Sequence, residues 1–292
     1  MRNGTLCLVA LGLAAFAAPD FGATIYNNLT PNNSMAIATR PGASSFEIEA
    51  ADDFFVGSQA LINSASFVGL IVPGSSGTSS ISDIVAEIYR VFPQDSDTVR
   101  TPNVPTRNNS PSDVAFDSRD SASNELTFSS SVLSSTFTAL NSVQPGGIHP
   151  SPGQNTLGNG PVTGQEVEID LTFATPFDLP ANHYFFVPQV ELTNGGTFYW
   201  LSASRPISGA GTTPFPPGVT DLQAWTRDAN LQPDWLRVGA DIVGGSPAPA
   251  FNTAFSLDGD LVPEPTTNMM MLAGLALIGT ARRIGALRKQ IG

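Results

Sequence analysis

The chain has 292 residues, 13 basic and 25 acidic side chains and one cysteine, which gives a formal net charge of −12 at pH 7. Nucleic acids and anionic lipids are disfavoured partners, because both are bound by positively charged surfaces. A single cysteine excludes a framework of disulfides within the chain. The length is sufficient for one large core or two small ones.

The first 23 residues are typical of a secretory signal peptide. Arg2 precedes the uncharged segment 6–18, which is rich in Leu and Ala. Ala15 and Ala17 match the small residues before a signal-peptidase site, and Ala23 offers a second position. The sequence therefore predicts export by the Sec machinery, with a signal helix over 1–23. Cys7 would be lost with it, which leaves a body without a thiol nucleophile.

The predicted body, 24–261, is acidic and favours β-structure. It contains eight arginines against 23 acidic residues, a formal charge of −15 (8 − 23). Short apolar segments rich in β-branched and aromatic residues alternate with Gly, Pro, Ser and Asn, which is typical of strands joined by turns. The expected strands are 46–49 with 52–56 as a pair or one bent strand, 61–72, 84–92, 126–137 as one or two strands, 165–173, 183–192, 197–203, 222–226, 235–238 and 251–257.

Two of these segments allow more detailed predictions. In 165–173, apolar and polar residues alternate, so Val167 and Ile169 are expected in the core and Glu168 in solvent. Strands 183–192 and 197–203 flank Asn194-Gly195-Gly196, a sequence that favours a β-hairpin.

The body as a whole is predicted to be one antiparallel β-sandwich, jelly-roll-like, without a stable helix of its own. The loops 93–122 and 144–164 are long, and bound cations are one means of ordering them.

The tail, 262–292, combines a break, an apolar segment and a basic end. Val262-Pro263-Glu264-Pro265 is expected to be extended and unpaired, because proline fixes φ and lacks an N–H. The uncharged segment 268–281 follows, and as a helix it spans about 21 Å, less than the roughly 30 Å of a bilayer core. Arg282 and Arg283 would hold its end in the cytoplasm. The alternative is a buried or amphipathic C-terminal helix.

This order resembles the PEP-CTERM sorting tail of Gram-negative bacteria. The resemblance rests on Pro263-Glu264-Pro265, the apolar segment 269–279 and Arg282-Arg283, and it covers the tail alone. It implies a single transmembrane helix that anchors the chain transiently in the inner membrane, with exosortase, a membrane-embedded transpeptidase, as partner. It also implies secretion or display at the cell surface, and an association with exopolysaccharide and biofilm. The basic end extends past Arg283 to Lys289, further than is usual.

Candidate catalytic residues are few. Glu166, Glu168 and Asp170 place three carboxylates on one strand face, but glycoside hydrolysis needs two carboxyls that converge from different elements. His149 and His183 are the two histidines, and neither belongs to a zinc or nucleophile-elbow pattern. The sequence therefore predicts no enzyme and no catalytic residue.

Two binding chemistries are possible on the body. Short acidic turns suit Ca²⁺, with Asp95, Asp97, Asp258 and Asp260 as candidate ligands, although such residues are also ordinary in turns; no other cofactor is expected.

Aromatic residues could stack on sugars, the candidates being Phe198, Tyr199, Trp200, Trp225 and Trp235. Tyr199 is expected to point opposite to Phe198 and Trp200, so that at least one of them lies in the core.

The sequence thus predicts a non-enzymatic extracellular or cell-surface matrix protein sorted by exosortase. A carbohydrate-binding β-sandwich and an extracellular hydrolase are the alternatives.

Overall fold

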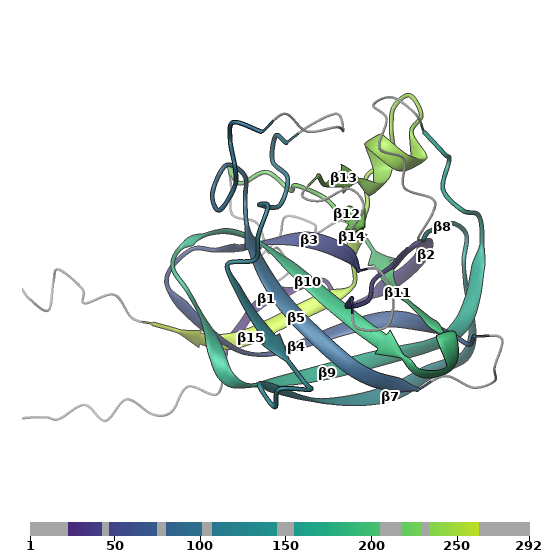
Figure 1. Cartoon of the computed structure of the whole chain (residues 1–292), viewed down its shortest axis with the longest axis horizontal. Coiled ribbons are helices and arrows are strands. Elements are labelled where there is room, and N and C mark those ends of the chain that lie inside the picture. Colours follow the sequence, from purple (N-terminus) through teal and green to yellow (C-terminus); the bar gives the residue numbers. More distant parts are fainter. Residues whose placement is uncertain are drawn as a thin grey trace, which may run out of the picture.

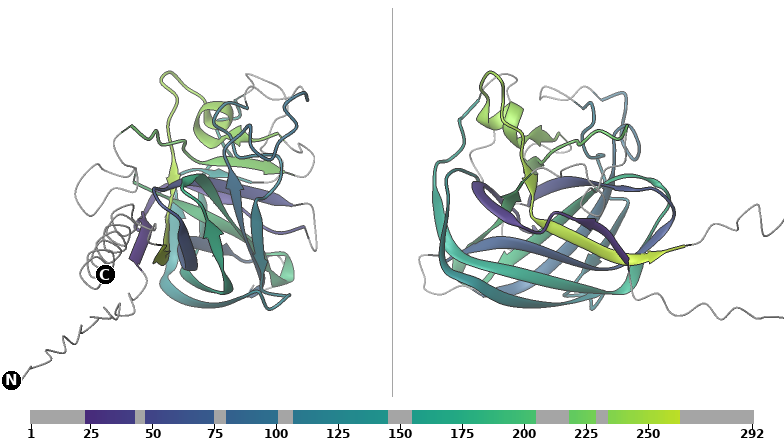
Figure 2. Two further views of the ribbon diagram at one scale, coloured as in Figure 1. Left: turned by 90° about the vertical axis from the view of Figure 1, so that its left-hand side faces the viewer. Right: turned by 180° about the vertical axis from the view of Figure 1, so that it is seen from behind.

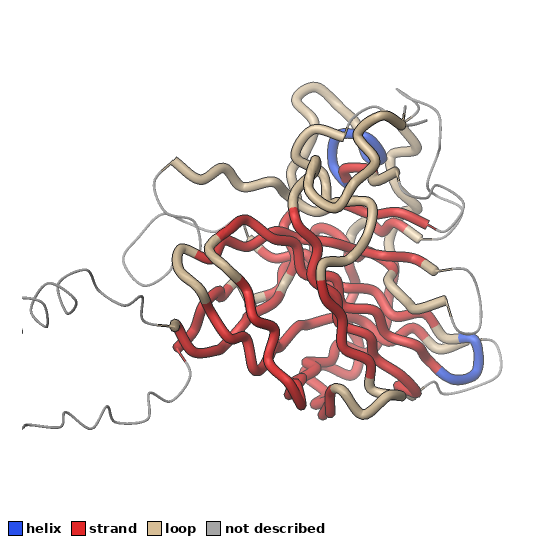
Figure 3. The backbone as a smooth tube through the Cα atoms, turned by 60° about the vertical axis from the view of Figure 1, so that its left-hand side comes forward, coloured by secondary structure: helices blue, strands red, loops and turns tan. Residues whose placement is uncertain are grey.

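The computed structural model describes residues 23–42, 47–74, 80–100, 107–144, 155–204, 218–228 and 234–262. These residues form two β-sheets that pack face to face (Figure 1). The helical elements of the described ranges are two short turns, η1 (Thr193–Gly195) and η2 (Val238–Val243), and strands make up most of the rest (Figure 3). The all-β prediction is confirmed.

The larger sheet has nine strands, and β4 lies at its centre. Along one path the order is β1-β15-β4-β11-β2-β8, and β14 pairs with β11. On its other side β4 pairs with β9, which in turn pairs with β7. The strands are β1 (Ala23–Asn27), β2 (Pro31–Ala38), β4 (Ala60–Val72), β7 (Leu126–Ala139), β8 (Ser142–Val143), β9 (Val162–Leu179), β11 (Thr197–Ala203), β14 (Asn252–Thr253) and β15 (Phe255–Leu261).

The smaller sheet has six strands in the order β13-β12-β3-β10-β5-β6, and every neighbouring pair is antiparallel. Its strands are β3 (Ile48–Val56), β5 (Ile81–Arg90), β6 (Asp117–Asp120), β10 (Asn182–Leu192), β12 (Trp225–Asp228) and β13 (Leu236–Arg237). Residues 46–56, expected as a pair or one bent strand, therefore contain the single strand β3.

The main core fills the space between the two sheets. Trp200 and Phe67 of the larger sheet contact Phe186 of the smaller one, with ring centroids 6.0 and 6.4 Å from that of Phe186. The alternation predicted for the apolar residues of β9 is confirmed, since Val167 and Ile169 are buried in this core. On the polar face Asp170 and Thr172 are exposed, whereas Glu168 is half-buried and Glu166 is buried. Burial of one face fixes the register of the strand, because a slip by one residue would turn those side chains to solvent.

A smaller apolar cluster covers part of the outer face of each sheet. On the larger sheet it includes Val68, Leu70 and Tyr199. On the smaller sheet it includes Tyr89, Phe185, Trp225 and Trp235.

The predicted hairpin between 183–192 and 197–203 is wrong. β10 pairs with β3 and β5 in the smaller sheet, whereas β11 pairs with β2 and β4 in the larger one. The turn η1 carries the chain across, with Asn194 and Gly195 at φ of 58° and 66°. Turn residues of this type supply the positive φ that an arch between sheets also requires, so the local sequence does not separate an arch from a hairpin.

Candidate functional site

The end of β15 joins the body to the tail. Directly after the last residue of β15, the Val262 N–H donates to the Gln59 carbonyl over 2.8 Å. Leu261 still pairs with Ala60 of β4, and its side chain is half exposed. The predicted sorting residues, which start with Val262, thus begin directly after the last residue of β15.

The first strand of the body lies beside this junction. β1 runs antiparallel to β15, and Ala23 is the partner of Gly259 (Figure 2). Both ends of the described body therefore lie on the same side of the larger sheet (Figure 1). Gly259 lies opposite a bulge in β4, where Asn63 is the extra residue, and a Cβ at Gly259 would lie 2.2 Å from the Leu61 carbonyl oxygen. Only glycine fits this close approach of backbone to backbone.

Several predicted residues lie outside the described ranges: the signal peptide up to residue 22, His149, Pro263, Glu264, Pro265, Arg282 and Arg283. The expected membrane helix over 269–279 lies there as well. Among the residues that are described, no helix has both the length and the apolar character needed to cross a membrane.

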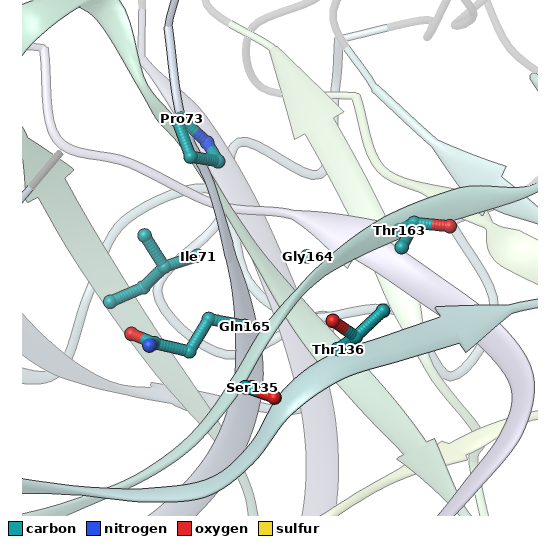
Figure 4. A pocket seen from close by; sticks show the side chains of 7 residues that line it. All are labelled: Ile71, Pro73, Ser135, Thr136, Thr163, Gly164 and Gln165. Atoms are coloured by element: carbon teal, nitrogen blue, oxygen red, sulfur yellow. The ribbon is translucent and has the colours of Figure 1, made fainter. Parts of the chain in front are cut away.

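A pocket of about 350 Å³ lies where β7 and β9 meet the end of β4 (Figure 4). Ile71 and Pro73 provide its apolar lining. The polar lining consists of the hydroxyl side chains of Ser135, Thr136 and Thr163 and the amide side chain of Gln165. The backbone of Gly164 completes it. No charged side chain lines it among these seven residues, although the body is strongly acidic.

Irregular pairing between β7 and β9 creates this pocket. The register of β7 shifts between Val132 and Ser134 and again between Ser134 and Phe137. Ser135 and Thr136 consequently have no partner residue in β9, and their side chains line the pocket. Bulges of this kind redirect side chains at sheet edges and near binding sites. The pocket can accept a neutral, hydroxyl-rich ligand by hydrogen bonds.

An ion-pair network lies on the outer face of the smaller sheet. Arg227 of β12 binds both carboxylate oxygens of Glu49 in β3, with the Nη2–Oε1 distance at 2.9 Å. The Tyr89 hydroxyl donates to Glu49 over 2.6 Å, and the Arg227 guanidinium lies 4.4 Å from the Trp235 ring centroid. Glu49 is 2% exposed. A bidentate, buried pair stacked on an aromatic ring suits arginine, because its flat guanidinium supplies paired donors.

Two further glutamates approach this network. Oxygen atoms of Glu47, Glu49 and Glu87 lie within 4.8 Å of one another, close enough to share a metal ion. Burial raises the pKa of Glu87 from 4.5 to about 8, and the carboxylates of Glu49 and Glu47 add to the rise. Glu87 is therefore protonated near neutral pH, and the network can hold either that proton or a cation at the same place.

This arrangement bears on the hydrolase alternative. Paired carboxyls with different proton affinities are the usual catalytic groups of glycosidases. Here Arg227 holds both oxygens of Glu49, and Gln189 donates to Glu47 over 2.8 Å. Glu49 and Glu47 thus already have partners within the protein, and Glu49 is buried.

Glu49, Glu87 and Arg227 were missed as site candidates in the sequence. The available signal was a charged residue inside a strand with a buried pattern, as at Glu87 in the β-prone segment 84–92. Arg227 lies 178 residues from Glu49, and no local pattern connects them.

A second group of buried acids, Asp52 and Asp53, belongs to β3 itself. The His183 Nε2 and Asp53 Oδ2 atoms are 2.6 Å apart, and the Leu222 N–H donates to Asp53 Oδ1 over 3.0 Å. Burial lowers the pKa of His183 to about 4 and raises the pKa of Asp53, so burial favours the uncharged form of each side chain. Next to it, Asp52 Oδ2 accepts from the Thr253 N–H and hydroxyl at 2.6 and 3.0 Å.

The carboxylates predicted on one face of β9 remain separate. Asp170 is exposed and accepts from the Ser66 hydroxyl over 2.6 Å. Glu168 and Glu166 precede Asp170 at alternate positions of the same strand, half-buried and buried respectively, and they are not among the clustered acids. The structure thus places these three side chains in a row rather than in a converging pair.

The Ca²⁺ candidates of the sequence are also apart from the clustered acids. Asp95 pairs with the Arg90 guanidinium, and Asp97 accepts from the Val99 and Arg100 N–H groups. Asp258 accepts from the Thr24 hydroxyl over 2.8 Å. Asp260 lies opposite Leu61 in the sheet. The group of three acids with suitable spacing that the described residues contain is the one at Glu47, Glu49 and Glu87.

The five candidate aromatic residues are all buried. Phe198 and Trp200 face the main core, and Tyr199 faces the opposite side, as the alternation predicted. Trp225 and Trp235 belong to the outer cluster of the smaller sheet and are 1% and 2% exposed. A stacking platform for sugars is therefore not formed by these side chains.

The comparison with protein families identifies the tail. A family described as the PEP-CTERM protein-sorting motif matches residues 261–289. No curated protein and no solved structure matches the chain significantly. The tail is thus a PEP-CTERM sorting signal, and such a signal marks an exported, secreted or cell-surface protein that exosortase processes.

Proposed function

We propose that the chain is a non-enzymatic extracellular or cell-surface matrix protein of a Gram-negative bacterium, delivered by exosortase after transient anchoring in the inner membrane. Export by Sec would remove residues 1–23, and processing near Pro263-Glu264-Pro265 would release the body from its tail. An association with exopolysaccharide or biofilm is part of this proposal.

The observation that carries the proposal is the junction at Val262. The sorting match starts at residue 261, which is also the last residue of β15, and the next residue, Val262, donates its N–H to the Gln59 carbonyl. The pairings of the described strands reach residue 261, so release of the chain near Pro263-Glu264-Pro265 would leave these pairings in place.

The shared side of the two ends supports temporary anchoring. Ala23 and Gly259 are neighbours, so the signal segment before β1 and the tail after β15 join the body at one place. Before signal cleavage the signal segment would hold the body at the membrane, and afterwards the tail would do so. In both cases the edge of the body formed by β1 and β15 would face the membrane. A transpeptidase in the membrane would then act at Pro-Glu-Pro, whose prolines lack the N–H that a sheet or helix requires.

The non-enzymatic part of the proposal is supported by the state of the acids. Those of β9 lie in a row, and the two buried groups are bound by Arg227, Gln189 and His183.

A mutation of the sorting motif tests the delivery route. Replacement of Pro263, Glu264 and Pro265 by alanine should leave the chain uncleaved and bound to the membrane fraction, while the body stays folded. Immunoblotting of membrane and medium fractions measures this. The matched control replaces three neighbouring residues, Thr266, Thr267 and Asn268, by alanine and should be processed normally. Equal release of both variants would contradict the proposed route.

The pocket between β7 and β9 favours a second candidate function, the binding of neutral glycans. Its volume of about 350 Å³ falls in the range of small-ligand sites, and hydroxyl and amide groups suit sugar hydroxyls. Without a stacking aromatic ring, we expect weak affinity.

Thr136→Val tests this candidate, because it removes a lining hydroxyl and nearly preserves the side-chain shape. Thr127→Val is the control, since Thr127 is an exposed threonine of the same strand outside the pocket. Titration with neutral oligosaccharides, followed by NMR or calorimetry, should show weaker binding for Thr136→Val alone. Equal binding by both variants, or none by the wild type, would remove the candidate.

A further inference from the structure

The edge strand β7 combines three features that are rarely left together on a protein surface. It is 14 residues long, it contains no charged residue and no proline, and most of its residues are exposed. In Figure 1 it is the outermost strand, next to β9, and no other described strand pairs with it. Proteins usually protect such an edge with charges, prolines or short strands, because a free edge pairs with other chains.

The core-facing side of β7 also exposes apolar side chains. Phe128 pairs with Leu171 and Val132 with Val167, and both partners are buried in the main core. Directly opposite residues of neighbouring strands point to the same face of a sheet. Nevertheless Phe128 is 37% and Val132 58% exposed, so the smaller sheet does not cover this edge.

The regular part of the strand is Leu126–Val132. Over these residues the pairing with β9 continues without a register shift, and the bulges begin only after Val132. A segment without bulges is the part of an edge that can accept another strand, since bulges deform the row of backbone donors and acceptors.

We propose that β7 is a self-association site, at which a second copy of this chain adds its own β7 in antiparallel orientation about a two-fold axis through Ser130. An antiparallel pair of identical strands forms a closed two-fold interface, in which the same residues contribute from both copies. With Ser130 opposite its counterpart, Phe128 of each copy lies opposite Val132 of the other. An aromatic residue opposite a β-branched one is a favourable cross-strand pair.

The charge distribution favours association of two copies through this edge over association through other parts of the surface. The body carries a formal charge of −15 (8 − 23), so most of its surface repels a second copy. β7 brings together uncharged, hydroxyl-rich segments instead, and Ser129 of one copy meets Ser131 of the other on the outer face. The two larger sheets would then continue as one sheet across the axis.

The association is expected to be weak. A single strand pair buries less than the roughly 1,200 Å² found at the lower end of stable interfaces. Weak pairing at one edge suits a protein that is monomeric during export and associates where its concentration is high.

Cysteine cross-linking tests both the site and the register. The body without its signal peptide has no cysteine, so Ser130→Cys introduces a single thiol. On the axis the two Cβ atoms would lie about 4.5–5.5 Å apart, near the spacing of disulfides. Mild oxidation of the secreted protein should therefore give a covalent dimer much faster than with Val99→Cys, a control at a side chain that is 90% exposed away from β7. Equal rates for the two variants would overturn the proposal.

Sedimentation equilibrium provides the second measurement. Val132→Lys places a charge opposite Phe128 of the second copy, and it should weaken dimerisation about tenfold or more. Val99→Lys makes the same change at an equally apolar exposed side chain and should leave the association constant unchanged. A monomer at all concentrations, or a dimer that Val132→Lys does not weaken, would contradict self-association through β7.

Discussion

Replacing Arg227 by methionine tests whether the network on the smaller sheet is assembled as described. Methionine preserves the contact with the Trp235 ring and removes the charge that binds Glu49. The Glu49 side chain is 3% exposed, so its carboxylate would remain buried without its main partner. Breaking a buried ion pair from one side costs about 3–5 kcal/mol, out of a total stability of about 5–15 kcal/mol.

Urea denaturation, monitored by tryptophan fluorescence, measures this loss directly. Trp225 and Trp235 lie in the same cluster as the network and report its opening. Arg90→Met is the control, because the side chains of Arg90 and Asp95 are 31% and 20% exposed, and the loss of such a pair costs about 1 kcal/mol or less.

A double variant separates the charge from the packing. Glu49→Gln combined with Arg227→Met removes both charges, so it should recover a large part of the stability that Arg227→Met loses. The reasoning would be refuted if Arg227→Met cost no more than Arg90→Met, or if the double variant were less stable than either single one.

Three further substitutions test other parts of the fold. Burial raises the pKa of Glu87 from 4.5 to about 8. Between pH 4.5 and pH 8 the folded state therefore holds a proton that the unfolded chain has released. The free energy of unfolding should fall with rising pH by up to about 1.4 kcal/mol per pH unit over this window. Glu87→Gln should remove that slope in urea denaturation measured across the window, and an unchanged slope would count against it. Burial also raises the pKa of Asp52, so the charged form of this side chain is disfavoured in the fold. Asp52→Asn keeps an acceptor for Thr253 and should raise the free energy of unfolding at pH 7.5 by about 1–2 kcal/mol. A variant less stable than the wild type would be contrary evidence. Gly259→Ala would place a Cβ 2.2 Å from the Leu61 carbonyl, and thermal unfolding should show a loss of about 2–3 kcal/mol, whereas an unchanged Tm would contradict the bulge geometry.

The strands that could be predicted are those whose pattern reflects one buried face. β9 alternates because its apolar residues face the core, and β4 ends at Val72, directly before Pro73-Gly74, as proline and glycine indicate. β1 and β2 were not predicted, since Pro31 and three asparagines reduce their strand propensity, and pairing with β15 and β11 holds them instead.

Pairing partners could not be predicted in the same way. The sequence between β10 and β11 contains a good turn, but long-range pairing places the two strands in different sheets. Nor could the exposure of β7 be predicted, because it depends on how far the smaller sheet extends over Phe128 and Val132.

The same division applies to the candidate sites. A sorting tail is a linear segment whose signal is local, and the family match to 261–289 confirms the predicted PEP-CTERM tail. The pocket depends on register shifts in β7, and the ion-pair network joins residues 178 positions apart. Neither leaves a periodic pattern in the sequence.

The intact mass of the secreted protein is the most direct test of the central claim, that the tail is a temporary handle for an exported body. Mass spectrometry of the product from a host with exosortase should show a chain that lacks the signal peptide and ends near Pro263-Glu264-Pro265. The same chain from a host without exosortase should retain its C-terminus through Gly292. A secreted product with an intact tail in the host that contains exosortase would contradict the account.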